Sequence, residues 1–333
     1  MLKGVTASLR GVSLINVLML SNHDYGGSGW LIKRAVESTG LAKVTHVKGS
    51  SHPYGYQSDI TLVDATDRAQ ALEALKSCDI IHFKGDDPPP FVLGGMHVTY
   101  GDSKPKLITV GGSSFRRKRD GLSDYVAGGR YEDELYLQHA DCRVALTPDL
   151  NYPWFKGEWI PAPIEMPNTP CWQKPTSTIR IGHSPQSRRK KGTDSVFLPA
   201  VKILQEKGYD IEPVVLENML HAECVEKKRS LDIFWDQCVV GAYGNSALEA
   251  MCHGIPTMCH IAEISISQAE GQFDDCPVIN FDPTPQSCAN AMMSLIDSGM
   301  TEVSKKTYEW TKNTHGLNAV GERYIKAYDR LLQ

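Results

Sequence analysis

The segment from Ile179 to His260 constrains the fold more than any other part of the chain. Its first expected strand, Ile179–Gly182, is followed by a small polar turn that holds Arg188–Lys191, and a helix comes next. A second glycine-rich turn, Gly241–Ser246, opens another helix whose first turn contains Glu249. Adjacent turns rich in cationic groups and backbone N–H groups, at the ends of parallel strands, suit a diphosphate. A glutamate just inside such a helix suits the hydroxyls of a ribose, so the segment predicts a nucleotide-binding half.

Short apolar runs alternate with helical patterns throughout this second half. Alternation of this kind predicts a parallel sheet with helices on its faces. The expected strands are Ile179–Gly182, Ile211–Leu216, Ile233–Trp235, Pro256–Cys259 and Val278–Phe281, and the expected helices are Val196–Lys207, Ala222–Ser230, Ala247–Cys252 and Cys288–Ser298.

The first half of the chain shows the same alternation. Its loops follow the carboxyl ends of the strands, which is typical of a doubly wound parallel sheet. The expected strands are Ile15–Leu20, Val44–Val47, Ile60–Val63, Ile80–Phe83, Leu107–Val110 and Val144–Thr147, and the expected helices are Trp30–Ser38 and Ala69–Lys76.

The length of 333 residues predicts two domains rather than one core. Seven prolines between Pro148 and Pro175 disfavour regular structure there and indicate the linker. We therefore predict an N-terminal Rossmann-like domain over 1–165 and a C-terminal one over 166–315. The remaining segment, 316–333, contains an expected amphipathic helix from about Ala319 to Leu332.

Charge and cysteine content narrow the class of protein. A formal net charge of −4 gives no global attraction to nucleic acid or to anionic membranes, so such partners would need a local patch. Nine cysteines without a C-x-x-C pair predict a reducing, cytoplasmic location. The apolar run Leu14–Leu20 is too short to span a bilayer, and no integral membrane segment is expected. The oligomeric state stays open.

Three clusters of residues in the second half resemble the donor half of a retaining GT-B glycosyltransferase, similar to the glycogen-synthase-like and sucrose-synthase-like group. This resemblance implies two Rossmann-like domains that face a cleft. It implies a nucleotide sugar on the second domain, an acceptor on the first, and a tail helix packed back toward the first domain. The clusters are His183-Ser184-Pro185 with Arg188 and Lys191-Gly192-Thr193; Leu216-Glu217 with His221 and Glu223; and Asp236-Gln237, Gly241, Tyr243-Gly244, Leu248-Glu249-Ala250-Met251, Gly254 and Pro256.

The first half resembles that group more loosely. Asp24–Gly29 lies where the group has a glycine-rich loop, and Gly111-Gly112-Ser113 with Arg116 lies where it often has H-G-S-x-x-R. Two positions depart from the pattern. Many members have two glutamates eight positions apart, but here Gly241 occupies the first position, and Gly111 replaces the frequent histidine.

The resemblance implies a role for each site residue. Arg188 and Lys191 are expected to neutralise the leaving diphosphate, because a guanidinium fork and an ammonium both suit phosphate oxygens. Asp24, Ser113 and Arg116 are expected to bind the acceptor. The expected donor-binding residues are Gly27, Ser28, His183, Arg188, Lys191, Leu216, Glu217, Tyr243, Gly244, Asn245, Ser246 and Glu249.

No metal and no further cofactor are expected. The chain has no D-x-D pair, so cationic side chains must replace an acidic metal clamp, and the nucleotide sugar is a co-substrate. The pairs Cys252-His253 and Cys259-His260 are better explained by packing than by a zinc site.

Simpler explanations and rival functions remain. A basic run is most often a solvated face, Glu249 can complement a helix dipole, and His183 can serve turn hydrogen bonding as well as donor contact. The basic run Arg116–Arg119 is either a solvated loop or a contact for an anionic acceptor: lipid, phosphorylated glycan or DNA. The rival functions are a glycosyltransferase acting on hydroxylated DNA bases and a non-catalytic nucleotide-sugar-binding protein, which Gly111 and Gly241 keep open.

Overall fold

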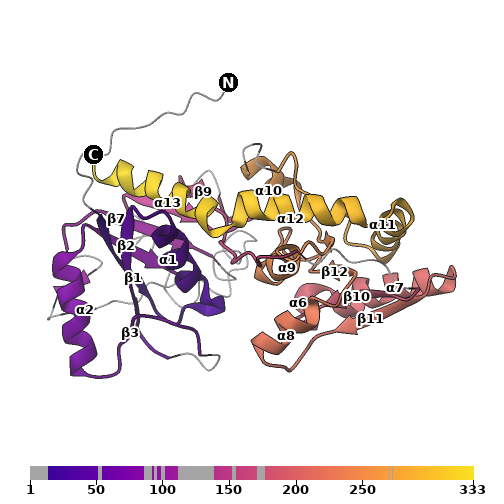
Figure 1. Ribbon diagram of the computed structural model, residues 1–333, viewed down its shortest axis with the longest axis horizontal. Helices are drawn as coiled ribbons and strands as arrows, with labels where there is room; N and C mark the ends of the chain where they lie inside the picture. The colour runs from indigo at the N-terminus through magenta and orange to yellow at the C-terminus, as the bar shows by residue number, and fades with distance from the viewer. Residues whose placement is uncertain are drawn as a thin grey trace, which may run out of the picture.

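A computed structural model describes residues 14–51, 55–85, 92–93, 96–98, 102–111, 139–151, 155–170, 177–269, 271 and 273–333. The chain forms two α/β halves that lie side by side along the long axis of the molecule (Figure 1). Each half is built on its own parallel sheet. The predicted class, two doubly wound parallel-sheet units, is confirmed.

The N-terminal sheet has the strand order β3-β2-β1-β4-β7-β8-β9, and its neighbouring strands pair in parallel. From β1 the chain moves outward to β2 and β3, then returns to place β4 on the other side of β1. The reversal creates a switch point between the carboxyl ends of β1 and β4, where open α/β sheets bind ligands. The strands are β1 (Ile15–Ser21), β2 (Ala42–Lys48), β3 (Ile60–Thr61), β4 (Ile80–Lys84), β7 (Lys106–Val110), β8 (Cys142–Ala145) and β9 (Glu158–Trp159).

Helices cover both faces of this sheet. Helix α2 (Ala65–Ser77) packs Ala71 and Leu75 against one face. It begins four residues before the predicted start, because Asp64 and Asp67 form a capping box at its first turn. Helix α1 (Ser28–Ser38) covers the other face together with α13 (Leu317–Leu331).

The C-terminal sheet has the parallel order β11-β10-β12-β13. Helices α7 and α11 pack on one face, where their apolar side chains join the strands in a single core. Helix α9 covers the opposite face with α8 beside it. The elements are β10 (Ile179–His183), α7 (Leu198–Glu206), β11 (Ile211–Val215), α8 (His221–Lys228), β12 (Ile233–Trp235), α9 (Asn245–Met251), β13 (Thr257–Met258), α10 (Glu263–Gln268) and α11 (Pro285–Ser298).

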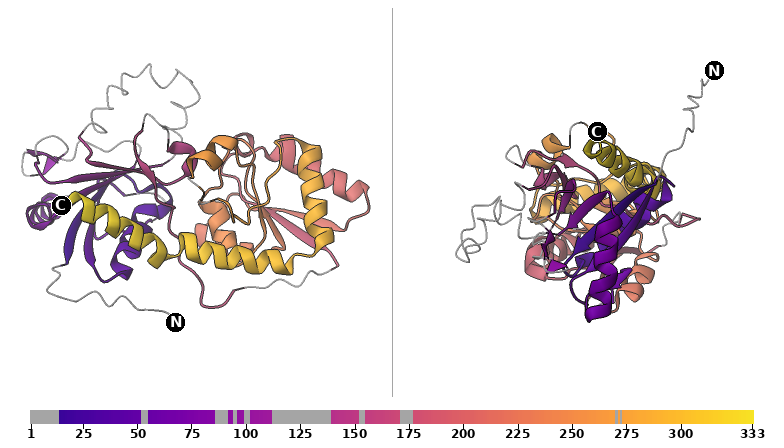
Figure 2. Two further views of the ribbon diagram at one scale, coloured as in Figure 1. Left: turned by 90° about the horizontal axis from the view of Figure 1, so that it is seen from above. Right: turned by 90° about the vertical axis from the view of Figure 1, so that its left-hand side faces the viewer.

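The last two helices join the halves. Helix α12 (Thr301–His315) runs along the C-terminal half, and α13 continues along the N-terminal half (Figures 1 and 2). Helix α13 lies so close to α1 that a Cβ on Gly321 would be 2.0 Å from the carbonyl oxygen of Ala35. Inside the sheet, His82 bonds both the Tyr328 hydroxyl and Thr109, at 2.8 and 2.7 Å.

Some elements differ from the sequence-based prediction. The segment between Pro148 and Pro175 contains β9, which extends the N-terminal sheet, and a 3₁₀ turn, η3 (Pro148–Leu150). The expected strand Val278–Phe281 contributes one isolated bridge, from Ile279 to Met258. A small antiparallel pair, β5 (Val92–Leu93) with β6 (Met96–His97), was not predicted. Within the described ranges, the helices all fall short of the length and apolar character needed to cross a membrane.

Candidate functional site

The predicted basic turn is a single helical turn, α6 (Arg188–Lys191), directly after β10. It ends at Gly192, whose φ of 87° lies in the left-handed region that favours glycine. A Cβ at this position would also lie 2.3 Å from the Cys238 sulfur. The helical path then resumes as a π-helical turn, η4 (Thr193–Phe197), and continues into α7. Gly192 therefore sets the direction in which Lys191 projects.

Lys191 points across the carboxyl ends of the sheet toward β12. Its ammonium is 2.7 Å from one carboxylate oxygen of Asp236, a residue that is 1% exposed. The second oxygen of Asp236 accepts a hydrogen bond of 2.8 Å from the backbone N–H of Gly244, the residue before α9. The ammonium is also 4.0 Å from the place of a Cβ on Gly244. The structure therefore brings together the two turns that the sequence predicted to be neighbours.

Arg188 is held by carboxylates on both sides. Its guanidinium contacts Glu217, which follows β11, at 3.0–3.2 Å, and Asp194 at 2.7 Å. The hydrogen bonds that Arg188 donates to Glu217 and then to Asp194 raise the pKa of Arg188 further above its usual value. Two oxygens of Glu217 already occupy the fork that was predicted to hold phosphate. A diphosphate at Arg188 therefore meets the two remaining N–H donors of the guanidinium unless a carboxylate moves.

The side chains of His183 and Leu216 are both buried. The His183 ring is completely buried, with one nitrogen 3.0 Å from the carbonyl oxygen of Trp235 and the other 2.7 Å from the Thr193 hydroxyl. Burial lowers the pKa of His183 to about 4, so the ring is neutral. His183 thus serves the hydrogen bonding of the turn, one of the two roles expected for it, and its contact with a donor stays a prediction. The Leu216 side chain is buried in the core, which leaves its backbone as the part able to meet a base.

Tyr243 also lies in the interior. Its hydroxyl is 2.9 Å from the ring of His315 at the end of α12, and the other nitrogen of His315 is 2.7 Å from the carbonyl oxygen of Ala162. Burial raises the pKa of Tyr243 well above its usual value and lowers that of His315 to about 4. These hydrogen bonds between uncharged groups connect the turn before α9 to Ala162, in the segment that links the two halves. The Tyr243 hydroxyl is thus bonded within the protein, and the predicted contact of this residue with a donor stays a prediction.

Glu249 is held in place on α9 by two cationic groups. The fully buried ammonium of Lys228 contacts its carboxylate and is 2.7 Å from the Ser246 hydroxyl. The His221 ring is 2.8 Å from the other carboxylate oxygen. Burial alone would raise the pKa of Glu249, but the His221 hydrogen bond and the Lys228 charge lower it. Glu249 is thus an ionised carboxylate in a fixed position next to the turn.

We expect the stabilising contribution of His221 to depend on pH. The hydrogen bond to Glu249 raises the pKa of His221 above 6.5. Protonated His221 therefore stabilises the fold below about pH 6.5, and this contribution disappears as pH rises through the raised pKa. Because the side chain is 59% exposed, the effect is a few tenths of a kcal/mol. In urea unfolding, His221→Ala should lower stability at pH 5.5 and leave it unchanged at pH 8.5; an equal loss at both would contradict the ion pair.

Steric crowding and a left-handed backbone explain why position 241 is a glycine. Its φ is 81°, and a Cβ there would be 2.7 Å from the Cβ of Ala262. Its carbonyl oxygen accepts hydrogen bonds from the Ala262 N–H at 2.9 Å and the Ser265 hydroxyl at 2.6 Å. The turn is thus closed against α10, and a glutamate cannot occupy this position without moving the backbone.

The glycine-rich loop of the N-terminal half is built around Asp24. The Asp24 side chain is 2% exposed, and its two oxygens accept from the backbone N–H groups of Gly29 and Trp30, at 2.7 and 3.2 Å. The first turn of α1 therefore already has an anionic partner. Asp24 therefore has a role in opening α1, and its predicted contact with an acceptor stays a prediction. Gly27 and Ser28 open α1 beside it, and the Gly27 N–H donates to the Asp24 carbonyl.

The two halves meet near this loop. A Cβ on Gly26 would lie 3.0 Å from the Asn245 side-chain nitrogen at the start of α9. A pocket between the halves has a volume of about 10 Å³, which is room for roughly one water. A nucleotide sugar therefore requires this pocket to open. Its lining residues are Leu146, Thr147, Pro148, Trp159, Ala162, Tyr243, Gly244, Asn245, Leu248 and His315. The predicted acceptor residues Ser113 and Arg116 lie outside the described residues.

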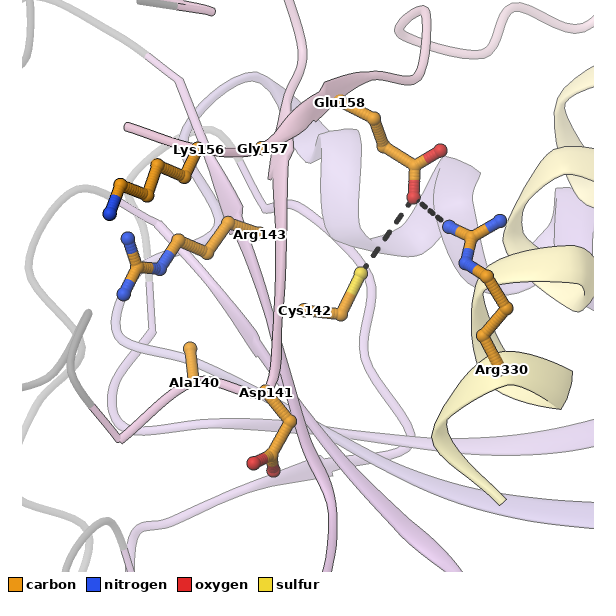
Figure 3. A pocket seen from close by; sticks show the side chains of 8 residues that line it. All are labelled: Ala140, Asp141, Cys142, Arg143, Lys156, Gly157, Glu158 and Arg330. Carbon is orange, nitrogen blue, oxygen red and sulfur yellow. Dashed lines mark hydrogen bonds and ion pairs between the residues drawn. The ribbon is translucent and has the colours of Figure 1, made fainter. Parts of the chain in front are cut away.

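A larger hollow of about 490 Å³ lies elsewhere, at the amino ends of β8 and β9. Figure 3 shows Glu158 between the Cys142 thiol and Arg330, with Arg143 and Lys156 on the other side. Burial raises the pKa of Cys142 to about 11, so its thiol is not a nucleophile at neutral pH. The hollow lies at the strand ends opposite to those that carry the candidate site.

Sequence reasoning gave no site role to three polar residues that the structure places at or beside the site. Asp236, which belonged to the third motif cluster, bridges Lys191 and Gly244. Lys228 supports Glu249 from within α8, and Lys84 ends β4 at the switch point. Asp236 and Lys84 had a visible signal, because each is a charged residue at the end of a strand. Lys228 had none, because it follows Lys227 on a helix that looks entirely solvated.

Two doubly wound parallel sheets with their carboxyl-end turns in contact define the GT-B fold, and this chain has it. HepE from Anabaena, solved with UDP and glucose, is 12% identical and aligns over 95% of this chain and 99% of its own, with a TM-score of 0.61. Sucrose-phosphate synthase from Thermosynechococcus elongatus is also 12% identical, over 95% and 99%, with a TM-score of 0.60. A putative UDP-N-acetylglucosamine 2-epimerase from Listeria monocytogenes is 13% identical, over 95% and 96%, with a TM-score of 0.55. No protein-family model matches the sequence, and no curated protein sequence is significantly similar to it.

Proposed function

We propose that the protein is a glycosyltransferase. Its donor is a nucleoside-diphosphate sugar, most simply a UDP-sugar, and it transfers the sugar to an acceptor hydroxyl. The observation that carries the proposal is the contact of Lys191 with Asp236 beside the Gly244 turn, at the carboxyl ends of β10 and β12. A GT-B fold supports it, because neighbours of that fold were solved with UDP and UDP-glucose. The motif resemblance in 181–260 supports it independently.

In this proposal the diphosphate leaves toward a cationic cradle. As the glycosidic bond breaks, its electron pair goes to the diphosphate oxygen, and Lys191 and Arg188 stabilise the added charge. The backbone N–H groups of Asn245 and Ser246, at the start of α9, point into the same turn. Glu249 accepts hydrogen bonds from the ribose, and the backbone at Leu216 and Glu217 meets the base.

Retention, metal independence and the finer assignments belong to the same proposal. The likeness to retaining enzymes in 181–260 supports attack of the acceptor on the face that the diphosphate leaves. The lysine and arginine of α6 support a diphosphate held without a metal. The division at 165 and 315 is supported by the separate sheets. A reducing, cytoplasmic location is supported by the eight described cysteines, which are free thiols.

A panel of nucleotide sugars, read by mass spectrometry, tests the proposal. We expect one donor to release free nucleoside diphosphate, with equal rates in the presence and absence of EDTA. Epimerase chemistry, suggested by the 2-epimerase neighbour, would change the sugar without changing the mass of the nucleotide sugar. Tight binding of a donor without any product would favour the non-catalytic rival. Loss of activity in EDTA, restored by a divalent cation, would refute metal independence.

The rival in which DNA bases are modified has its own test. Binding to duplex DNA through phosphate contacts weakens steeply as salt rises. We propose a glycan or lipid acceptor ahead of DNA, because the formal net charge is −4 and both Arg188 and Lys191 of α6 face carboxylates. A strongly salt-dependent affinity for DNA would reverse that order.

A further inference from the structure

Two lysines end neighbouring strands of the N-terminal sheet, on either side of Ser21. In the sheet register Ser21 of β1 pairs with Lys48 of β2 and with Lys84 of β4. Residues that pair in adjacent parallel strands point to the same face, so these three side chains share the face covered by α1 and α13. The two lysine backbones are two strand spacings apart, roughly 10 Å, and their flexible side chains can converge on one group.

Lys84 is buried without a hydrogen bond among the described residues. Its side chain is 7% exposed, and its nearest carboxylate oxygen, on Asp24, is 3.9 Å from the ammonium nitrogen. That distance is too long for a hydrogen bond. Both Asp24 oxygens are already used by the N–H groups that start α1. Lys84 therefore keeps its three N–H donors for another partner.

Lys48 is equally buried and only partly satisfied. Its side chain is 3% exposed, and its ammonium donates to the carbonyl oxygen of Tyr56. Two further N–H donors remain on an ammonium that makes one such bond. The charges of both lysines and of Asp24 act on His46, but burial lowers its pKa to about 4, so it adds no charge at neutral pH.

The charges around Lys84 are unevenly paired. The ammonium of Lys84 is 3.9 Å from the Asp24 carboxylate, whose oxygens already accept from the N–H groups of α1. Asp59, the other acidic group that acts on His46, is 3.2 Å from the ammonium of Lys33, which also contacts Glu37 at 2.8 Å. A buried charge without a hydrogen-bonded partner is costly. Lys84 is therefore suited to an anion from outside the chain.

The position of Lys84 also points to a ligand. Lys84 and Ser21 end β4 and β1, the two strands between which the chain reverses direction in the sheet. Ligands of open parallel sheets bind at this crevice. The glycine-rich loop borders the crevice, and its Gly26 meets Asn245 of the other half. An anion there would lie on the N-terminal side of the contact between the halves.

We propose that Lys84 and Lys48 bind an anionic group of the acceptor, a phosphate or a carboxylate, between them at Ser21. The assignment of this anion to an acceptor rests on the transferase function proposed above, whereas the anion site itself does not. The negative group gives Lys84 the close partner that Asp24 does not provide, and the rest of the acceptor extends toward Asn245 and the donor half.

Thermal unfolding of the full chain tests the anion site. Inorganic phosphate, and acetate in a parallel arm, replace chloride at constant ionic strength, and Tm is followed for the unaltered chain and for Lys84→Met. An anion that binds the folded state raises Tm. We expect Lys84→Met to weaken the phosphate or acetate response by at least about tenfold in apparent Kd. In chloride alone we expect its Tm to equal or exceed that of the unaltered chain, because an uncompensated charge is removed.

Lys106 provides a matched control. Lys106 is about as buried as Lys84, but it begins β7, whereas Lys84 ends the neighbouring strand β4. Its ammonium donates to the carbonyl oxygens of Asp102 and Lys104. Lys106→Met should lower Tm and leave the anion response intact. If Lys84→Met instead lowers Tm like Lys106→Met, or does not fold, Lys84 is a structural partner of Asp24 and the proposal is wrong. An unchanged anion response in Lys84→Met overturns it as well.

A second variant supplies the anion covalently. Ser21→Asp places a carboxylate between the two lysines, and we expect it to abolish the response to added phosphate and acetate. A full response in this variant contradicts the site. The double variant Arg188→Ala/Lys191→Ala should keep the response, since those residues belong to the other half; its loss there would assign the anion effect to the donor side.

Calorimetric titration with UDP separates this inference from the proposed function. Lys84→Met should bind UDP within about twofold of the unaltered chain, and a loss of tenfold or more would assign Lys84 to the donor diphosphate instead of the acceptor. If no nucleotide sugar is turned over but the Lys84-dependent anion response persists, the transferase proposal fails while the anion site stands.

Discussion

Lys191→Ala is expected to reduce the turnover of the nucleotide sugar by about 100-fold or more, with the fold intact. Removing one group that stabilises charge on a leaving oxygen typically costs about 3 kcal/mol of transition-state stabilisation, and each 1.4 kcal/mol is tenfold in rate. The ammonium of Lys191 is the cationic group that the structure places directly against the Gly244 turn. Removing it also leaves the buried Asp236 carboxylate without its cationic partner, which adds a repulsive charge to the diphosphate site.

The measurement is kcat for release of nucleoside diphosphate, with circular dichroism to confirm folding. Lys190→Ala is the matched control, because Lys190 is an exposed lysine on the same turn of α6 and should retain full activity. Arg188→Ala should lose at least tenfold but less than Lys191→Ala, because Glu217 and Asp194 already hold the guanidinium. Full activity of both Lys191→Ala and Arg188→Ala would remove the diphosphate assignment.

Gly192→Ala is expected to destabilise the fold by about 3 kcal/mol. A left-handed backbone costs a residue with a Cβ about 1–2 kcal/mol, and forcing an extra atom into a packed site costs a further 1–3 kcal/mol. At Gly192 both apply, because φ is 87° and the Cβ would be 2.3 Å from the Cys238 sulfur. The backbone N–H of Cys238 donates to the Lys191 carbonyl, so a shift here also displaces the candidate catalytic lysine.

A comparison of the urea unfolding of Gly192→Ala and Gly208→Ala isolates the cost of the steric contact with Cys238. Gly208 has a similar φ of 91°, but nothing lies within 4 Å of the place of its Cβ. Gly208→Ala should therefore cost the backbone contribution alone, about 1–2 kcal/mol. Equal losses in the two variants would show that the contact with Cys238 relaxes freely and that Gly192 is required for its backbone conformation only.

The parallel sheets could be predicted from the sequence because buried parallel strands leave a strong local pattern. The predicted strands Ile80–Phe83 and Leu107–Val110 are each apolar at three of four positions, and each is followed by glycine or polar residues. Helix α12 was not predicted, although it is among the longest helices described. Its buried face consists largely of small polar residues, including Ser304, Thr307 and Thr311, so it lacks the apolar period that marks a helix.

The candidate site was only partly predictable. The proximity of the α6 turn to the Gly244 turn follows from parallel strand order, and the structure has it. Which side chains reach solvent does not follow from local sequence. His183, Tyr243 and Asp24 are polar residues of the kind that contact ligands, yet all three are buried. His183 and Tyr243 meet partners from distant segments, Trp235 and His315, whereas Asp24 accepts from Gly29 and Trp30 of its own loop.

The sequence by itself determined the class of fold and the position of the basic and glycine-rich turns at strand ends, because those features depend on residues a few positions apart. The tertiary structure decided how the charges are paired. Asp236 meets Lys191 across 45 positions of chain, Lys228 supports Glu249 from a neighbouring helix, and Lys84 is buried near a carboxylate that has other partners. Charge pairing and burial depend on long-range packing, because a buried side chain loses its contacts with water and interacts only with the groups that the fold places beside it.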